Sequence, residues 1–127
     1  MLTVEKALRV YAEMINTLDS SKLEPLLSTD FHYASQMVLS EIESKQEYLT
    51  YINSKLNVVR TFGTKVWAEM AILTHSFPGP CVVLAQGDKE NLVALVLAKV
   101  KGDQIERIDM CIVPTPQSAK RSGEYPN

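Results

Sequence analysis

The sequence predicts an α+β fold in which three helices of the N-terminal half pack on an antiparallel sheet formed by the C-terminal half. In residues 3–18 and 44–63, apolar side chains recur every three or four positions, which is the period of a helix. From Lys65 onward they alternate with a period of two, which is the period of a strand. A length of 127 residues suits one domain and is too short for two.

The first and third helices are predicted from capping residues as well as from periodicity. Thr3 can cap the first amides of the helix at residues 3–18. Ser44 and Glu47 have capping-box spacing and begin the third helix, which Gly63 is suited to end. The buried faces are Val4, Leu8, Tyr11, Ile15 and Leu18 in the first helix and Tyr48, Ile52, Leu56 and Val59 in the third.

A short second helix and an early strand are predicted between these two helices. Ser21 and Glu24 have capping-box spacing, and Pro25 is early enough in a helix to be tolerated. Residues from Phe31 to Leu39 are aromatic and branched, which favours a strand or a strand pair.

Four strands separated by turn-forming residues are predicted in the C-terminal half, at about 65–74, 81–86, 91–100 and 104–113. Strands joined this closely are antiparallel neighbours. Residues 1–113 therefore form the predicted domain. Residues 114–127 contain three prolines and are predicted to form a flexible tail.

Charge and composition argue against several classes of protein. Thirteen basic and fifteen acidic residues give a net charge of −2, whereas nucleic-acid binding needs a concentrated cationic face. No stretch approaches the roughly 18 apolar residues of a membrane span, and no signal peptide follows Met1. We therefore expect a cytoplasmic protein that binds neither membranes nor nucleic acid. Cys81 and Cys111 are expected to be reduced, apolar strand residues.

The strand at residues 91–100 is apolar on both faces. Helices in so small a domain can cover only one side of the sheet, so the other side is expected to meet a second subunit. A homodimer is the preferred interpretation. The alternative is a central strand that is shielded by the long turns.

The order of elements, together with FHYASQ at residues 31–36 and GDQIERID at residues 102–109, resembles the nuclear transport factor 2-like superfamily. That superfamily includes ketosteroid isomerases and polyketide cyclases, and the resemblance covers about residues 3–113. It implies a curved sheet that the helices close into a cystatin-like α+β cone with a pocket inside. It also implies acid–base side chains in that pocket in the enzymes, and dimers through the outer face of the sheet.

Asp109 and His32 are the candidate catalytic residues. Asp109 lies inside a predicted strand, where an ionised carboxylate is costly unless it is paired or faces water. It is either a pocket base or a solvated aspartate paired with Arg107. His32 alternates with Tyr33, so only one of them points into the cone, His32 as a proton shuttle or Tyr33 as a hydroxyl donor.

The candidate ligand-binding residues are those whose polar groups could reach the pocket. Each has a structural alternative, either core packing or a charge on the outer face of the sheet. The set consists of Tyr11, Tyr33, Gln36, Tyr48, Trp67, Glu69 and Arg107.

These residues favour a domain that binds a small, largely apolar molecule. The alternatives are an acid–base enzyme (an isomerase, cyclase or dehydratase) and a non-catalytic dimeric adaptor whose pocket is filled by its own side chains. No cofactor is expected, because the sequence has no phosphate-binding glycine loop. A zinc site is not expected either, because both histidines and both cysteines would have to converge.

Overall fold

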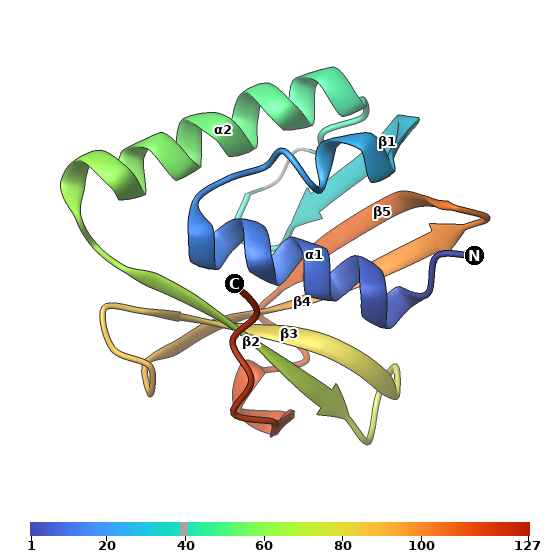
Figure 1. The fold of residues 1–127 in the computed structure, drawn as a ribbon. Coiled ribbons are helices and arrows are strands. Elements are labelled where there is room, and N and C mark those ends of the chain that lie inside the picture. Colours follow the sequence, from blue (N-terminus) through green and yellow to red (C-terminus); the bar gives the residue numbers. More distant parts are fainter. Residues whose placement is uncertain (39–40) are drawn as a thin grey trace.

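The chain folds into a curved sheet with helices on one face (Figure 1). The computed structural model describes residues 1–38 and 41–127. These residues form two α-helices, two 3₁₀ turns and one six-stranded sheet. In chain order the elements are α1 (Val4–Thr17), η1 (Glu24–Leu26), β1 (Leu27–Ser35), α2 (Lys45–Phe62), β2 (Val66–Leu73), β3 (Gly79–Gln86), β4 (Leu92–Lys101), β5 (Gln104–Cys111), η2 (Pro116–Ser118) and β6 (Lys120–Arg121).

The helices α1 and α2 begin and end as their capping residues predict. The side chains of Thr3 and Ser44 each accept a hydrogen bond from the backbone amide three residues further on. Gly63 ends α2 in the left-handed conformation with φ 77°, which costs glycine little. Both helix predictions are confirmed. Neither helix of the described residues is long and apolar enough to cross a membrane.

The predicted second helix is wrong, because the chain forms only the 3₁₀ turn η1 before β1 begins at Leu27. Pro25 lacks an amide hydrogen and occupies the start of this turn. Leu23 and Leu27 are both buried, but Leu23 belongs to a turn and Leu27 to a strand. The early strand runs over Leu27–Ser35, and its predicted end at Leu39 lies outside the described residues.

The sheet has the strand order β1-β5-β4-β3-β2-β6. The strands β2 to β5 are antiparallel neighbours, as predicted. However, β1 pairs with β5 in parallel, so the sheet is mixed and not wholly antiparallel. The strands β1 and β5 are far apart in sequence, and such a connection permits either direction. A rule about consecutive strands could not predict this pairing.

One large core lies between the helices and the inner face of the sheet. The helix α1 packs against β2, β3 and β4, and α2 packs against β1 (Figure 1). The largest fully buried side chains of this core are Tyr11, Tyr48, Phe31, Leu8, Met14, Leu23, Leu27, Ile105 and Ile108.

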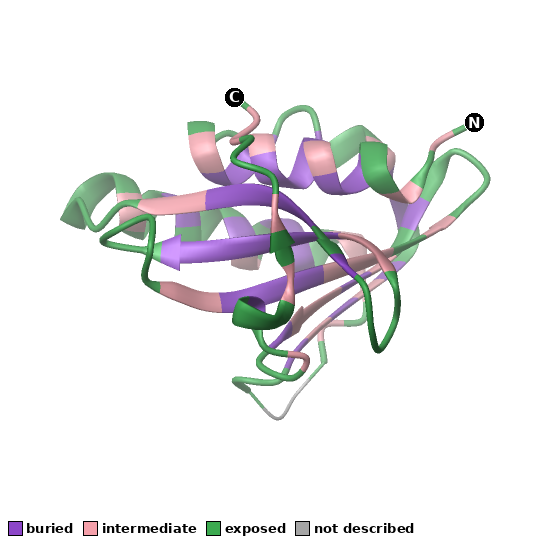
Figure 2. Cartoon of the chain, turned by 90° about the horizontal axis from the view of Figure 1, so that it is seen from below, coloured by how far each residue is buried: buried purple, intermediate pink, exposed green. Residues whose placement is uncertain are grey.

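Residues 112–127, which we name the C-terminal strap, cross the outer face of the sheet (Figure 2). Within the strap, β6 pairs with the edge of β2, and the amide of Met70 donates to the carbonyl of Glu124 over 2.9 Å. At its end, the side-chain amide of Asn16 donates to the carbonyl of Pro126 over 2.6 Å. The strap is thus part of the packed domain, unlike the flexible tail that its composition predicts. It supplies backbone partners that the edge of β2 would otherwise lack.

The outer face of β4 is covered within the single chain. Leu95 is 0% exposed, and Ala119 of the strap packs against the same cluster. The cluster consists of Ala71, Leu73, Cys81, Val83, Leu95 and Cys111. The prediction of a homodimer assumed that the outer apolar face of the sheet is uncovered. The strap covers this part of that face.

Candidate functional site

The predicted site residues divide between the two faces of the sheet. Tyr11, Tyr33 and Tyr48 lie in the core beneath the helices. The remaining six lie on the outer face, at its margin or at the end of β1: His32, Gln36, Trp67, Glu69, Arg107 and Asp109. The fold therefore does not bring the whole predicted set together.

His32, Arg107 and Asp109 form one polar cluster on the outer face with Glu41. The parallel register of β1 and β5 places His32 beside Arg107 and Ala34 beside Asp109. The Arg107 Nε donates to Asp109 Oδ2 over 2.9 Å, and Nη2 donates to Oδ1 over 3.0 Å. The Arg107 Nη1 donates to Glu41 Oε1 over 2.6 Å, and His32 Nδ1 lies 3.2 Å from the same oxygen.

The charges in this cluster stabilise one another. The hydrogen bonds and charge of Asp109, followed by those of Glu41, raise the pKa of Arg107 above its ordinary value. Hydrogen bonds from His32 and Arg107 lower the pKa of Glu41. Asp109 is thus partly exposed and paired with Arg107, which corresponds to the second of the two alternatives given for it above. Sequence reasoning missed Glu41, because it lies in an irregular segment with no periodicity.

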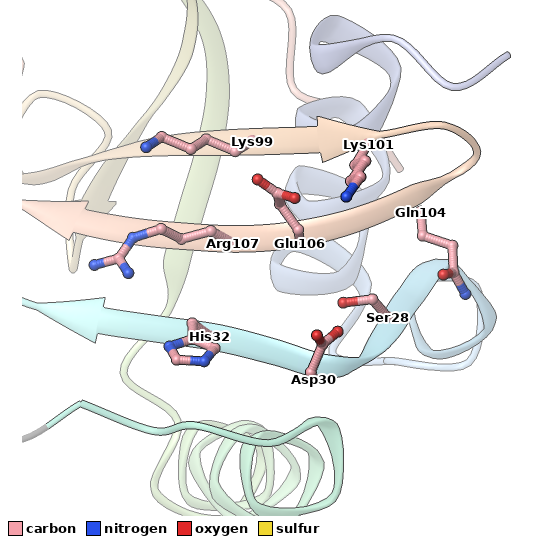
Figure 3. A pocket seen from close by; sticks show the side chains of 8 residues that line it. All are labelled: Ser28, Asp30, His32, Lys99, Lys101, Gln104, Glu106 and Arg107. Atoms are coloured by element: carbon pink, nitrogen blue, oxygen red, sulfur yellow. The ribbon is translucent and has the colours of Figure 1, made fainter.

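A polar hollow of about 380 Å³ lies on this face, over β1, β5 and β4 (Figure 3). Its cationic and anionic side chains are interleaved, with Glu106 between Lys99 and Lys101. The lining residues are Ser28, Asp30, His32, Lys99, Lys101, Gln104, Glu106 and Arg107.

A second hollow, which we name the apolar groove, has a volume of about 690 Å³. Leu97 and Cys111 of the outer face line it, together with the loop 77–80 and with Val113 and Pro114 of the strap. Phe77 at its margin is 72% exposed. Lys99 lines both hollows, Arg107 lines the polar hollow, and Asp109 lines the apolar groove. The two hollows are therefore neighbours.

Gln36, predicted to contact a ligand, lines the apolar groove and also binds the beginning of the strap. Its Oε1 accepts hydrogen bonds from the amides of Ile112 and Val113 over 2.6 and 2.8 Å. Its Nε2 donates to the carbonyl of Val113 over 2.9 Å. All of these contacts are made with the backbone, so they fix the strap where it leaves β5.

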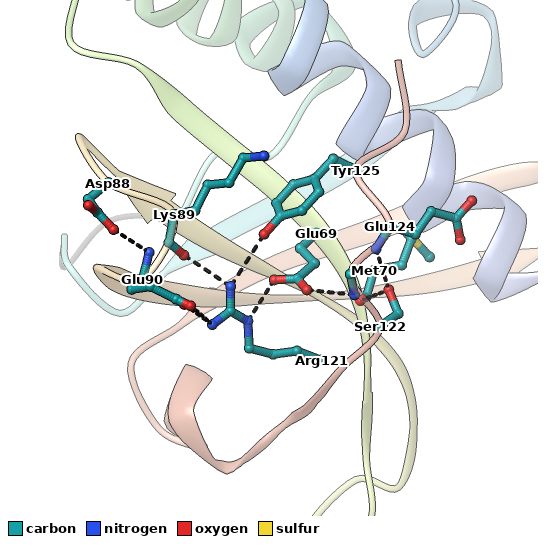
Figure 4. Close-up of polar contacts among 10 residues, drawn as sticks. Glu69, Met70, Asp88, Lys89, Glu90, Arg121, Ser122, Glu124 and Tyr125 are labelled. Carbon is teal, nitrogen blue, oxygen red and sulfur yellow. Dashed lines mark hydrogen bonds and ion pairs between the residues drawn. The ribbon is translucent and has the colours of Figure 1, made fainter.

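Glu69, also predicted to contact a ligand, binds the far part of the strap (Figure 4). This carboxylate is 3% exposed and accepts from Arg121 Nε over 2.7 Å and from the amide of Gly123 over 2.8 Å. Arg121 also donates to Glu90 over 2.7 Å. Hydrogen bonds to Glu90 and then to Glu69 raise the pKa of Arg121. Trp67 lies on the same strand, with Lys65 Nζ 5.8 Å from its ring centroid.

The predicted tyrosines fill the space beneath the helices. The ring centroid of Tyr48 lies 4.9 Å from that of Phe31 and 5.1 Å from that of Tyr33. The Tyr48 hydroxyl is buried and has no hydrogen-bond partner among the described residues. Tyr11, Tyr33 and Tyr48 line neither the polar hollow nor the apolar groove. Phenol side chains occupy this part of the expected internal pocket.

Burial raises the pKa of Tyr11, Tyr33 and Tyr48 above the ordinary value, so the folded state favours their neutral form. An unfolded chain ionises tyrosine near pH 10, about its reference pKa. Stability is therefore complete below that pH and decreases as the pH rises toward the folded-state pKa. We expect tyrosinate absorbance from these residues to appear together with loss of the helical circular dichroism signal. Full ionisation of every tyrosine near pH 10 with an unchanged spectrum would contradict this expectation.

Cys81 and Cys111 are buried with free thiols, and burial raises the pKa of Cys81 to about 11. Within residues 1–38 and 41–127, no three His, Cys, Asp or Glu side chains come close enough to hold a metal ion.

Comparisons by sequence identify no relative. No protein-family model matches the chain, and no curated protein matches it.

Comparisons by structure find a shared fold. An NTF2-like protein of unknown function from Cytophaga hutchinsonii matches with a TM-score of 0.58 and 12% identity, covering 90% of this chain and 95% of that one. A proposed ketosteroid isomerase from Kribbella flavida matches with a TM-score of 0.58 and 18% identity, covering 84% and 75%. A proposed polyketide cyclase from Pseudomonas putida matches with a TM-score of 0.56 and 15% identity, covering 87% and 92%.

The fold and the hollows thus define an α+β protein with a curved sheet, a polar hollow on its outer face and a neighbouring apolar groove that also reaches Val4 of α1. The matched structures identify the architecture as the nuclear transport factor 2-like fold, as the sequence resemblance implies. One fold of this kind hosts many unrelated functions, so the site must be argued from its own residues.

Proposed function

We propose that the chain binds a small amphipathic molecule, with the largely apolar body in the apolar groove and the polar end toward the polar hollow. The supporting observation is that a groove of about 690 Å³ adjoins a polar hollow at Lys99. Sites for small molecules commonly have volumes of roughly 300–1,000 Å³, with apolar walls and a few polar groups.

Charge favours an anionic head group. Arg107 is already bound to Asp109 and Glu41. Lys99, at the junction of the hollows, makes no ion pair with the described residues. A carboxylate on the ligand would supply the missing partner, while Leu97 and Cys111 contact its apolar body.

The names of two structural neighbours support a ligand of about this size. Their names refer to ketosteroids and polyketides. Ketosteroids have a large apolar framework with a few polar atoms, so a similar framework would suit the apolar groove. The acid–base alternative, with Asp109 as base and His32 or Tyr33 as partner, receives less support, because both Asp109 oxygens accept from Arg107.

Decanoate is a suitable first probe, titrated into the full chain and followed by calorimetry. We expect saturable binding of one molecule per chain. Leu97→Glu should weaken binding by about tenfold or more, because it places a charge in the apolar groove. Val58→Glu is the matched control, since Val58 is an exposed aliphatic residue of α2 that lines neither hollow. It should bind decanoate as the parent chain does.

A comparison of decanoate with decanol tests the head group. Lys99→Gln should weaken decanoate binding and leave decanol binding unchanged. Equal affinities of the parent chain and of Leu97→Glu for decanoate would contradict the proposed site. No binding of either probe would favour the non-catalytic adaptor, whose interior is filled by its own side chains.

A further inference from the structure

We propose that the C-terminal strap occupies, within one chain, the surface on which a second copy of the chain would otherwise dock. Closing of the strap then gives a monomer, and its release gives a dimer. The ion pair between Glu69 and Arg121 acts as the latch. This inference does not depend on the proposed ligand.

The surface beneath the strap is apolar and continuous. Its six side chains are between 0% and 6% exposed, and they come from β2, β3, β4 and β5. Leu97 packs against this cluster, and Leu97 and Cys111 also line the apolar groove. Release of the strap would therefore join the newly exposed face to the groove in one apolar surface. Surfaces of this kind on soluble proteins mark sites of association.

The strap also covers the edge of β2. Lys120 and Arg121 pair with Ile72 and Ala71, and the Ser122 amide donates to the carbonyl of Met70 over 3.2 Å. An uncovered edge strand is a ready template for pairing with another chain. A released strap would thus leave both an apolar face and an unpaired edge.

A second copy is the partner that these two features fit. Two sheets pack face to face when their inner surfaces are apolar, and identical surfaces can do so about a two-fold axis. Stable pairs bury roughly 800 Å² on each partner. Such a pair would use the apolar face, so it cannot form while the strap covers it. The net charge of −2 adds little repulsion between copies.

The latch is the part of the strap where a small change has the largest effect. Glu69 is nearly fully buried, and it bonds both Arg121 and Gly123 on the strap. The double variant Glu69→Gln/Arg121→Gln removes both charges without leaving one of them buried alone. Arg60→Gln is the control, because Arg60 bonds the Leu18 carbonyl and not the strap.

Two measurements on the full chain test the proposal. The rate of thiol modification by Ellman's reagent reports release of the strap, because Cys81 and Cys111 both lie in the cluster beneath it. Light scattering after size exclusion reports the mass. We expect the parent chain and Arg60→Gln to be monomers with slowly reacting thiols. We expect thiols in the double variant to react about tenfold faster or more through local opening, with a mass that rises toward a dimer with concentration.

Each other result would overturn the proposal. Unchanged thiol rates would mean that the ion pair does not hold the strap, and faster thiols in a strict monomer would mean that the face does not accept a second copy. A dimer of the parent chain with protected thiols would mean that the strap does not prevent association. If the double variant does not fold, Ala119→Asp provides the same test from the strap side, because Ala119 packs on the covered cluster.

Discussion

Replacing Arg121 by alanine should lower the free energy of unfolding by about 3–5 kcal/mol, because it leaves the carboxylate of Glu69 charged, buried and unpaired. Glu69 is 3% exposed in the folded chain, so it has little contact with water that could replace the lost guanidinium. The single hydrogen bond from Gly123 would remain, and it cannot balance a full charge. Urea denaturation of the two chains measures the difference.

The reverse change should cost less. In Glu69→Gln the orphaned Arg121 is partly exposed and keeps its contact with Glu90, so we expect a loss of about 1–3 kcal/mol. Arg9→Gln is a useful control, because it removes the ion pair of Arg9 with Glu124, a more exposed contact of the same strap. Its effect should stay within about 1 kcal/mol. Equal losses for Arg121→Ala and Glu69→Gln would contradict the assignment of a buried latch.

Replacing Tyr48 by alanine should lower the free energy of unfolding by about 3–5 kcal/mol, because a large aromatic ring at the centre of the core would leave a cavity. Tyr48 is 0% exposed and its ring packs against Phe31 and Tyr33. Aromatic pairs of this geometry contribute beyond their buried area. Thermal and urea denaturation followed by circular dichroism measure the loss.

Replacing the same residue by phenylalanine should have the opposite sign or no effect. The Tyr48 hydroxyl has no partner among the described residues, and an unmade buried hydrogen bond costs about 1–3 kcal/mol. Tyr48→Phe removes that hydroxyl and keeps the ring. A destabilisation comparable to that of Tyr48→Ala would show that the hydroxyl has a partner, such as an internal water molecule.

The sequence predicts those features that local chemistry controls. Capping by Thr3 and Ser44 depends on neighbours within three residues, so both helix starts are predicted to the residue. The four-strand meander depends on turns between consecutive strands, and it too is predicted. The parallel partner of β1 is four strands further along the chain, so no local signal specifies it.

The candidate site is only partly predictable for the same reason. His32, Arg107 and Asp109 come together as one cluster, but on the outer face of the sheet. Gln36 and Glu69 have the polarity of ligand contacts, yet their partners belong to residues 112–127. That segment is rich in proline and polar residues, a composition typical of tails. Its backbone nevertheless forms hydrogen bonds with β2, and Arg121 pairs with the buried carboxylate of Glu69. Neither contact can be predicted from composition.

The position of the strap has a consequence for folding during synthesis on the ribosome. The side chain of Asn16 in α1 forms hydrogen bonds with the backbone of Ala68 and with the carbonyl of Pro126. The second of these contacts cannot form until a residue more than a hundred positions later has been synthesised. Until residues 112–127 emerge from the ribosome, the edge of β2 is unpaired and the apolar outer face of the sheet is exposed. A nascent chain in this state can associate with other nascent chains. Slow translation of the codons for residues 112–127 would prolong that interval and promote aggregation during synthesis.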